Sequence, residues 1–357
     1  MPRTVRCPLC RGGTGTVEHS KTRLLNLREP YAICRCEACG FLFLNPQPTV
    51  EELSEMYASD PYYAKENATR GAGRRRFYHA RMERLEHWRP GRGDMLGLGC
   101  LEGGYALEVA RSRGWQVAAV EFSPILADHA RSVLGIDVTV SDAWRLSPFE
   151  GSRFEAIVSQ SLEHVPDPRE TLAQCRDLLA PTGLLMLEVP NQFHSLIDLL
   201  KLAVVRIVGD RAFRWFHRDI TFEYHTLYFT PATLRALLAY EGFEVLELRT
   251  HLRAHPLYLG KGWRRRLQGL IHTAGGLLTA ARASRSSRPG VMLVVIGAHP
   301  HGSPPDLGSR IPPTESVVAE CLRFPFWGRP PFAARRSVAS MNASSPPSDA
   351  GIVPRAR

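Results

Sequence analysis

The sequence predicts an α/β fold with a parallel central sheet, preceded by a small cysteine-rich region and followed by a low-complexity tail. Between residues 93 and 298, short apolar runs alternate with helical stretches, which is typical of βαβ units. Five of the eight cysteines lie within the first 39 residues. From residue 299 onward the chain is rich in Pro, Ser and Arg. Such a composition cannot bury enough apolar surface to fold, so we expect residues 299–357 to be disordered.

Composition excludes several classes of protein. Of the 357 residues, 44% are hydrophobic and 22% are charged, which rules out a collagen-like, coiled-coil or wholly disordered chain. No run of 18 apolar residues is present, and the first ten residues lack the apolar segment of a secretory signal. We therefore expect a cytoplasmic protein whose cysteines serve as thiols or metal ligands and do not form disulfides.

The expected elements of the main region follow one another in regular order. Asp167, Pro168 and Glu170 have the pattern of a helix N-terminus, and Thr230-Pro231 begins another helix that ends at Gly242. The expected strands cover residues 95–98, 116–120, 138–140, 156–159, 184–189, 243–248 and 291–296, and the first helices cover 105–113, 124–133 and 168–179. A short helix near residue 50 begins with the capping box Thr49 to Glu52.

Two Cys-x-x-Cys pairs, 25 residues apart, carry the strongest local signal. Two such turns present four thiolates in a tetrahedron, which is the arrangement that a structural Zn²⁺ ion prefers. Gly40 suits the tight turn that follows, and Cys34 is an alternative to Cys36 as a ligand. A closed site of this type has no open position for a substrate, so we expect it to support folding. The predicted ligands are Cys7, Cys10, Cys36 and Cys39.

A glycine turn follows the first strand of the main region. Gly97 and Gly99 allow the backbone to approach a ligand closely, and the next helix offers free N–H groups. Glu121 ends the second strand, where a carboxylate can accept hydrogen bonds from ribose hydroxyls. A dinucleotide fingerprint would require a third glycine at the position of Glu102.

These residues resemble the class I S-adenosylmethionine (SAM)-dependent methyltransferases. The run from Gly97 to Gly103 is similar to the first motif of that family, except that Gly97 stands where the family has Asp. The resemblance implies a Rossmann-like sheet of seven strands and a bound SAM molecule. It places the ribose contact at Glu121 and Phe122 and the adenine contact at Asp142 and Ala143. The cofactor-binding residues that it implies are Gly97, Gly99, Cys100, Leu101, Gly103, Glu121, Phe122, Asp142, Ala143 and Ser161.

The cysteine-rich region points to a smaller group within these methyltransferases. Its paired cysteines, followed by residues 40–49, resemble the zinc-containing bacterial methyltransferases of sugar and polysaccharide pathways, which include deoxysugar C-methyltransferases. The resemblance implies a small-molecule acceptor, a sugar or nucleotide sugar of a glycan or natural-product pathway. Those C-methyltransferases carry a further C-terminal domain where this chain has its low-complexity tail, so O- and N-methylation stay open beside C-methylation.

The candidate catalytic residues lie after the fourth strand and before the last helix. They are His225, His164, Glu223 and Tyr224. An imidazole titrates near neutral pH, which suits removal of a proton from an acceptor. His225 also matches a histidine that serves as the base in related sugar methyltransferases. The alternative is structural: His164 then hydrogen-bonds the backbone of its loop, and His225 packs in the core.

The net charge of +10 is unevenly placed. Residues 251–290 contain eight Lys or Arg and no acidic residue. The basic, leucine-containing stretch 261–288 suits peripheral contact with an anionic membrane, attraction of a phosphorylated substrate or RNA, or a solvated helix packed on the sheet. RNA methylation is one rival function, but this charge lies away from the predicted catalytic edge. A second rival, suggested by Gly97, is a binding module that has lost turnover.

The domain boundaries follow from these patterns. We expect a zinc ribbon at residues 1–45, a helical connector at 46–92, the SAM-dependent methyltransferase domain at 93–298, and the tail at 299–357.

Overall fold

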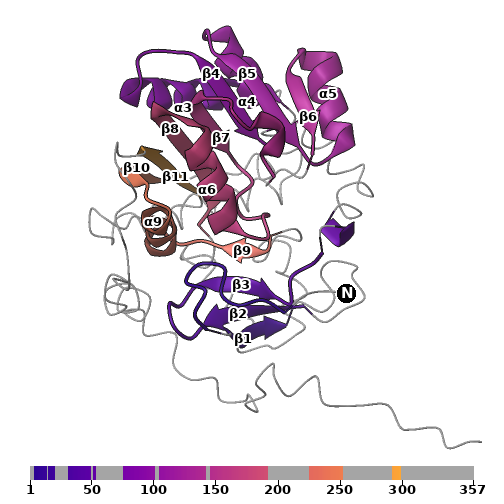
Figure 1. The fold of residues 1–357 in the computed structure, drawn as a ribbon, viewed down its shortest axis with the longest axis vertical. Coiled ribbons are helices and arrows are strands. Elements are labelled where there is room, and N and C mark those ends of the chain that lie inside the picture. Colours follow the sequence, from indigo (N-terminus) through magenta and orange to yellow (C-terminus); the bar gives the residue numbers. More distant parts are fainter. Residues whose placement is uncertain are drawn as a thin grey trace, which may run out of the picture.

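The computed structural model describes residues 4–13, 15–20, 31–49, 51–53, 75–100, 104–141, 145–191, 225–251 and 292–298. These residues form two sheets with helices packed on the larger one (Figure 1). The basic stretch 261–288 and the tail 299–357 lie outside the described residues. In the described part of the chain, no helix is both long and apolar enough to cross a membrane.

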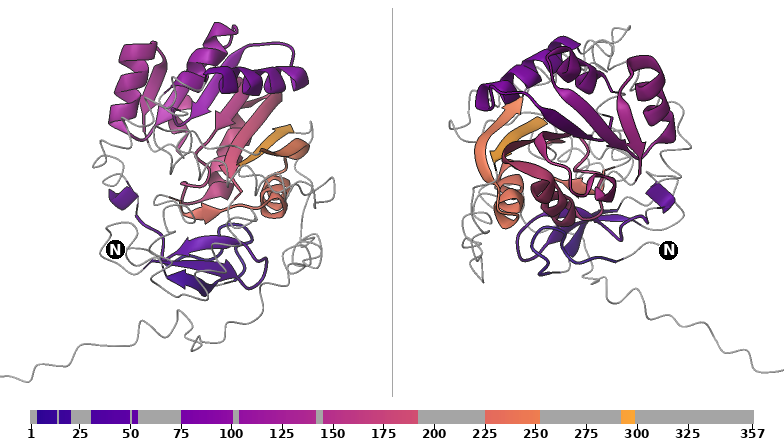
Figure 2. Two further views of the ribbon diagram at one scale, coloured as in Figure 1. Left: turned by 180° about the vertical axis from the view of Figure 1, so that it is seen from behind. Right: turned by 45° about the horizontal axis from the view of Figure 1, so that its top comes forward.

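The smaller sheet joins the cysteine-rich region to a strand from far along the chain. Its order is β1-β2-β3-β9, and each described pair of strands is antiparallel. Leu42 pairs with Tyr228 and Phe43 with Leu227. A strand from the second half of the chain is therefore added to the sheet that the first 45 residues form (Figure 2). The strands are β1 (Gly15–Ser20), β2 (Ala32–Cys36), β3 (Leu42–Asn45) and β9 (Leu227–Tyr228).

The larger sheet has the strand order β10-β11-β8-β7-β4-β5-β6. The neighbouring strands from β8 to β6 are all parallel, which confirms the predicted parallel central sheet. β11 runs antiparallel to both of its neighbours, a reversal that the sequence analysis did not predict. His251 at the end of β10 pairs with Met292 at the start of β11. β11 therefore begins at the end of the sheet where β10 finishes. The strands are β4 (Asp94–Leu98), β5 (Gln116–Glu121), β6 (Asp137–Val140), β7 (Phe154–Ser159), β8 (Leu179–Pro190), β10 (Glu244–His251) and β11 (Met292–Ala298).

Helices cover both faces of this sheet because its central strands are apolar on both sides. Successive residues of a strand point to opposite faces. On β8, Leu185 and Leu187 therefore join one core cluster, and Leu184 and Met186 join the other. The first cluster includes residues of α6 and α9, and the second includes residues of α3, α4 and α5. The helices are α3 (Arg75–Trp88), α4 (Tyr105–Ser112), α5 (Pro124–Leu134), α6 (Pro168–Leu178) and α9 (Pro231–Tyr240), with a short 3₁₀ helix at Ser147–Phe149.

The predicted helix starts are confirmed. The Asp167 carboxylate accepts hydrogen bonds from the N–H groups of Arg169 and Glu170. Thr230 accepts a hydrogen bond from the N–H of Thr233, whose side chain in turn accepts one from the N–H of Thr230. Side-chain caps of this kind each contribute about 1 kcal/mol to helix stability.

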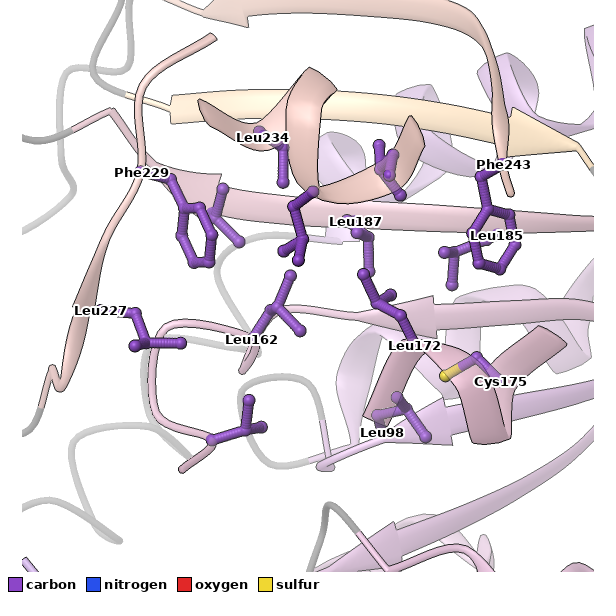
Figure 3. Close-up of a cluster of buried hydrophobic side chains, with 14 of the residues drawn as sticks. Leu98, Leu162, Leu172, Cys175, Leu185, Leu187, Leu227, Phe229, Leu234 and Phe243 are labelled. Atoms are coloured by element: carbon purple, nitrogen blue, oxygen red, sulfur yellow. The ribbon is translucent and has the colours of Figure 1, made fainter. Parts of the chain in front are cut away.

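The first core cluster extends from the main sheet into the cysteine-rich region. Phe229 lies beside Leu234 of α9, and Leu227 points toward Leu162 in the loop after β7 (Figure 3). The Phe229 ring also contacts the Phe41 ring, with centroids 5.4 Å apart. All three residues are buried, so the small sheet and the main domain share one continuous core.

Candidate functional site

The predicted glycine turn lies where the carboxyl ends of β4, β5 and β7 meet. Gly99 follows β4 directly and has a φ of +80°, a conformation that disfavours any residue with a Cβ. Its N–H donates to the carbonyl of Val120 at 2.8 Å, which extends the β4–β5 pairing by one residue. Gly104, with a φ of +95°, then precedes α4. The backbone thus turns sharply at the sheet edge where open α/β folds bind ligands.

Glu121 ends β5 beside this turn and is buried. One carboxylate oxygen, Oε2, accepts the N–H of Cys100 at 2.6 Å, and the other, Oε1, accepts the N–H of Ser123 at 2.8 Å. Burial raises the pKa of the Glu121 carboxyl, and these hydrogen bonds oppose that shift. The Phe122 N–H and the Cys100 thiol also hydrogen-bond this carboxyl, so Glu121 is held firmly at the edge of the glycine turn.

Gly99 faces Ser161 as well as Glu121. A Cβ added at Gly99 would lie 3.5 Å from Ser161 Oγ and 3.8 Å from Glu121 Oε2. The Ser161 hydroxyl donates to the Leu98 carbonyl at 3.0 Å, which fixes the loop after β7 against the end of β4. The structure therefore brings together three of the residues that the sequence predicts for the cofactor.

Gly97 lies inside β4, under α4. A Cβ at this position would come within 2.9 and 3.0 Å of the two methyl carbons of Leu107, which is fully buried. Leu107 thus occupies the space that the side chain of an aspartate would need.

Several predicted residues lie outside the described part of the chain. This applies to the cofactor candidates Leu101, Gly103, Asp142 and Ala143 and to the catalytic candidates Glu223 and Tyr224.

His164 and His225 meet at one buried carboxylate, although 60 residues separate them in the sequence. Glu163 Oε1 lies 3.7 Å from His164 Nε2 and 3.8 Å from His225 Nε2. The two rings are edge to face, with centroids 4.7 Å apart. Burial raises the pKa of the Glu163 carboxyl well above its usual range, and the nearby Glu188 carboxylate adds to that effect. We call these three residues the Glu163–His164–His225 cluster.

Backbone hydrogen bonds hold this cluster to the cysteine-rich region. The N–H groups of Thr226 and Leu227 donate to the Glu163 carbonyl at 2.9 and 3.1 Å. The N–H of Leu44, on β3, donates to the Thr226 carbonyl at 2.8 Å. β3 therefore fixes the segment that carries His225.

Sequence reasoning missed Glu163 and an adjoining buried ion pair. Arg81 Nε, on α3, lies 3.3 Å from Glu188 Oε2, on β8, and the Gln160 amide donates to the same oxygen at 2.9 Å. Glu188 is only 2% exposed, so this ion pair lies inside the protein. The sequence around Glu188 could not predict this ion pair, because Arg81 lies on a different element, 107 residues away in the chain.

The four predicted zinc ligands lie together. The Cys7 and Cys39 sulfurs are 3.6 Å apart, as are the Cys10 and Cys36 sulfurs, and all four lie within 4.8 Å of one another. Bonds of 2.3 Å to one tetrahedral Zn²⁺ would separate such sulfurs by about 3.8 Å, so the donor set fits this ion. Cys34 is not part of the cluster, which excludes it as the alternative to Cys36.

Both cysteine turns have the same backbone form. The N–H of Arg11 donates to the Cys7 carbonyl at 2.9 Å, and the N–H of Gly40 donates to the Cys36 carbonyl at 2.9 Å. Arg11 and Gly40 have φ values of +59° and +73°. Each Cys-x-x-Cys pair thus turns back on itself and presents both of its sulfurs to one point.

The main domain is similar to known methyltransferases. Residues 71–248 match the family described as "Methyltransferase domain". A stretch of 105 residues, 28% of this chain, is 35% identical to the ubiquinone biosynthesis O-methyltransferase of Xanthomonas campestris pv. campestris and covers 43% of that protein. The chain therefore spans less than half the length of the curated relatives that it matches.

Two solved structures are also similar. A SAM-dependent methyltransferase from Archaeoglobus fulgidus is 18% identical, with a TM-score of 0.42 over 63% of this chain and 94% of that one. The plantazolicin methyltransferase BpumL in complex with SAH is 16% identical, with a TM-score of 0.44 over 70% of this chain and 94% of that one.

Proposed function

We propose that this chain is a class I SAM-dependent methyltransferase, which its match to a methyltransferase domain family at residues 71–248 supports, and that it transfers a methyl group from SAM to a small-molecule acceptor. The observation that carries the proposal is the turn after β4, where Gly99 faces Glu121 and Ser161. These residues suit SAM because the glycine leaves room for a close approach and the carboxylate can accept hydroxyl hydrogens.

Each part of the turn has a role in holding the cofactor. Glu121 would accept hydrogen bonds from the ribose hydroxyls, and the Gly99–Cys100 backbone would line the methionine side. Leu101, Gly103, Phe122, Asp142 and Ala143 complete the proposed contacts. Bound SAM supplies an electrophilic methyl group on a positively charged sulfur. The residues of the chain then act mainly by orienting the two reactants.

The acceptor would lie beside the Glu163–His164–His225 cluster. When an acceptor oxygen attacks the methyl carbon, the bond from that carbon to sulfur breaks and S-adenosylhomocysteine (SAH) leaves. The acceptor proton passes to an imidazole nitrogen of His225 or His164. Glu223 and Tyr224 precede His225 in the chain, and we assign them to the acceptor side of the site.

Two classes of acceptor deserve a direct test. The resemblance of the cysteine-rich region favours a sugar or nucleotide sugar of a glycan or natural-product pathway. The partial similarity to ubiquinone biosynthesis O-methyltransferases instead favours an acceptor with a hydroxylated aromatic ring. Both classes present a hydroxyl group for O-methylation.

The cysteine cluster has a separate, structural role in this proposal. Cys7, Cys10, Cys36 and Cys39 would hold one Zn²⁺ ion as thiolates and leave no position open. We place the protein in the cytoplasm, where these thiols stay reduced.

Calorimetric titration of the zinc-loaded full chain with SAM and SAH tests the cofactor. We expect saturable binding of one equivalent, and at least tenfold weaker binding by Glu121→Gln, because its amide no longer offers two acceptor oxygens. Glu155→Gln is the matched control, since Glu155 lies near the opposite end of β7 and bonds the Asp94 N–H. No saturable binding by the native chain would contradict the proposal and favour a binding module that has lost turnover.

A panel of free sugars, nucleotide sugars and catechol-type phenols, read by SAH formation, then identifies the acceptor class. An RNA methyltransferase would instead use RNA, with binding that weakens steeply as salt increases.

A further inference from the structure

We propose that the Glu163–His164–His225 cluster binds a divalent metal ion, in a site separate from the four cysteines. The proposal deepens the proposed function, because the ion would hold and activate the acceptor oxygen. Its first step, metal binding, does not depend on SAM or on turnover.

The separations of the three groups suit a shared ion better than direct hydrogen bonds. An N–H···O hydrogen bond spans about 2.7–3.2 Å, but Glu163 Oε1 lies 3.7 and 3.8 Å from the two Nε2 atoms. Nitrogen and oxygen ligands about 2.1 Å from one tetrahedral ion lie about 3.4 Å apart. The Glu163 oxygen is thus within a few tenths of an ångström of this separation from each nitrogen, and one ligand atom from each of the three residues lies within 4.8 Å of the others. In the cysteine cluster, the 3.6 Å sulfur separations match their own ion equally closely.

The charge around Glu163 also favours a cation. Glu163 is 4% exposed, and its second oxygen, Oε2, has no hydrogen-bond partner in the described part of the chain. Arg81 pairs with the neighbouring Glu188 and is 3.3 Å from it, so that arginine balances a different carboxylate. An ionised carboxylate is costly to bury unless positive charge lies beside it, and a divalent ion would supply that charge.

Two histidines and one carboxylate leave positions open on the ion. Such a ligand set binds Mn²⁺, Fe²⁺, Co²⁺ or Zn²⁺ and is typical of sites that take a substrate. An acceptor hydroxyl bound at an open position would lose its proton more readily, because the ion stabilises the resulting oxyanion. With the ion bound, His164 and His225 would act as ligands in place of the role of base assigned to them above, and solvent would take up the proton.

Mn²⁺ is a selective probe, because it favours a site that contains a carboxylate over a site of four thiolates, which retain Zn²⁺. The zinc-loaded full chain would be titrated with Mn²⁺ alone, by calorimetry and by the paramagnetic resonance signal of free Mn²⁺. We expect one Mn²⁺ per chain. Glu163→Gln, His164→Ala and His225→Ala should each weaken binding at least tenfold.

The controls separate a lost ligand from a lost fold. Glu155→Gln should bind Mn²⁺ like the native chain, and every variant should retain its single zinc and its affinity for SAH. A native chain that binds no ion beyond one zinc, after exposure to Mn²⁺, Co²⁺ and Zn²⁺ in turn, would overturn the proposal. So would unchanged Mn²⁺ binding in Glu163→Gln. Because SAH binding is measured separately, failure of the metal site remains distinguishable from failure of the proposed methyl transfer.

Discussion

The cysteine cluster and the Glu163–His164–His225 cluster gather their ligands in different ways. Each cysteine pair lies on one tight turn, so the backbone of a few residues places two sulfurs at once. The second cluster joins two neighbouring residues of the loop after β7 to a histidine that precedes β9. It therefore exists only when the small sheet and the main sheet are packed together.

The two clusters are also linked. β3 leads away from the Cys36–Cys39 turn, and its Leu44 holds the Thr226 carbonyl. Thr226 and Leu227 in turn hold the Glu163 carbonyl. We infer that the cysteine cluster supports the fold directly and the histidine cluster indirectly. This difference predicts how the effects of mutations should rank.

The largest effect is expected from Cys39→Ser. Structural zinc contributes about 10–16 kcal/mol of binding free energy in zinc fingers, which exceeds the stability of many whole domains. The variant should lose its zinc, and its thermal midpoint should fall by roughly 10 °C or more. Cys34→Ala is the control, since Cys34 is also buried but lies outside the cluster. Elemental analysis and thermal denaturation measure both, and full zinc content in Cys39→Ser would contradict the expectation.

His225→Ala should affect turnover far more than stability. Loss of the group that activates the acceptor typically costs about 10²–10⁴-fold in rate. The thermal midpoint should fall by only a few degrees, because His225 lies at the edge of the core. His79→Ala, on α3 beside Arg113, is the matched control and should keep near-native turnover. Turnover of the His225 variant within twofold of the native rate would place the chemistry elsewhere.

Gly97→Asp should destabilise the protein by about 1–3 kcal/mol, because the new side chain would overlap the buried Leu107. The resemblance alone suggests a gain in SAM affinity from this change, but the packing predicts none. Urea denaturation and SAM titration test both statements. In a double-mutant cycle with Leu107→Ala, the two changes should cost less together than the sum of their separate effects. If Gly97→Asp alone is as stable as the native chain, the Leu107 side chain can move aside without cost, and the expectation is wrong.

The smallest effect is expected from Arg11→Ala. Arg11 Nη2 lies 2.5 Å from Asp167 Oδ2 and connects the first cysteine turn to the start of α6, but its side chain is 48% exposed. Exposed pairs contribute less than about 1 kcal/mol, and salt reduces that further. Asp167→Ala should cost about 1 kcal/mol more, because it also removes the cap of α6. Chemical denaturation of both variants checks the order, and the reverse order would refute it.

Sequence reasoning succeeded where a short segment determines its own structure. The Cys-x-x-Cys turns, the Asp167 and Thr230 caps and the Gly99 turn each depend on residues within a few positions of one another. The periodicity of apolar runs likewise predicted the parallel sheet, because strands buried on both faces must be apolar throughout. Such features need no knowledge of distant partners.

Only the tertiary structure decided which distant residues meet. It filled the space beside Gly97 with Leu107, paired Arg81 with Glu188 and brought His225 to Glu163. Each of these outcomes depends on how one element packs against another. The sequence by itself determined the turns, the caps and the strand pattern because their causes are local. The neighbours of Glu163 and Gly97 were decided by the fold, because side-chain contacts across a core depend on how whole elements pack.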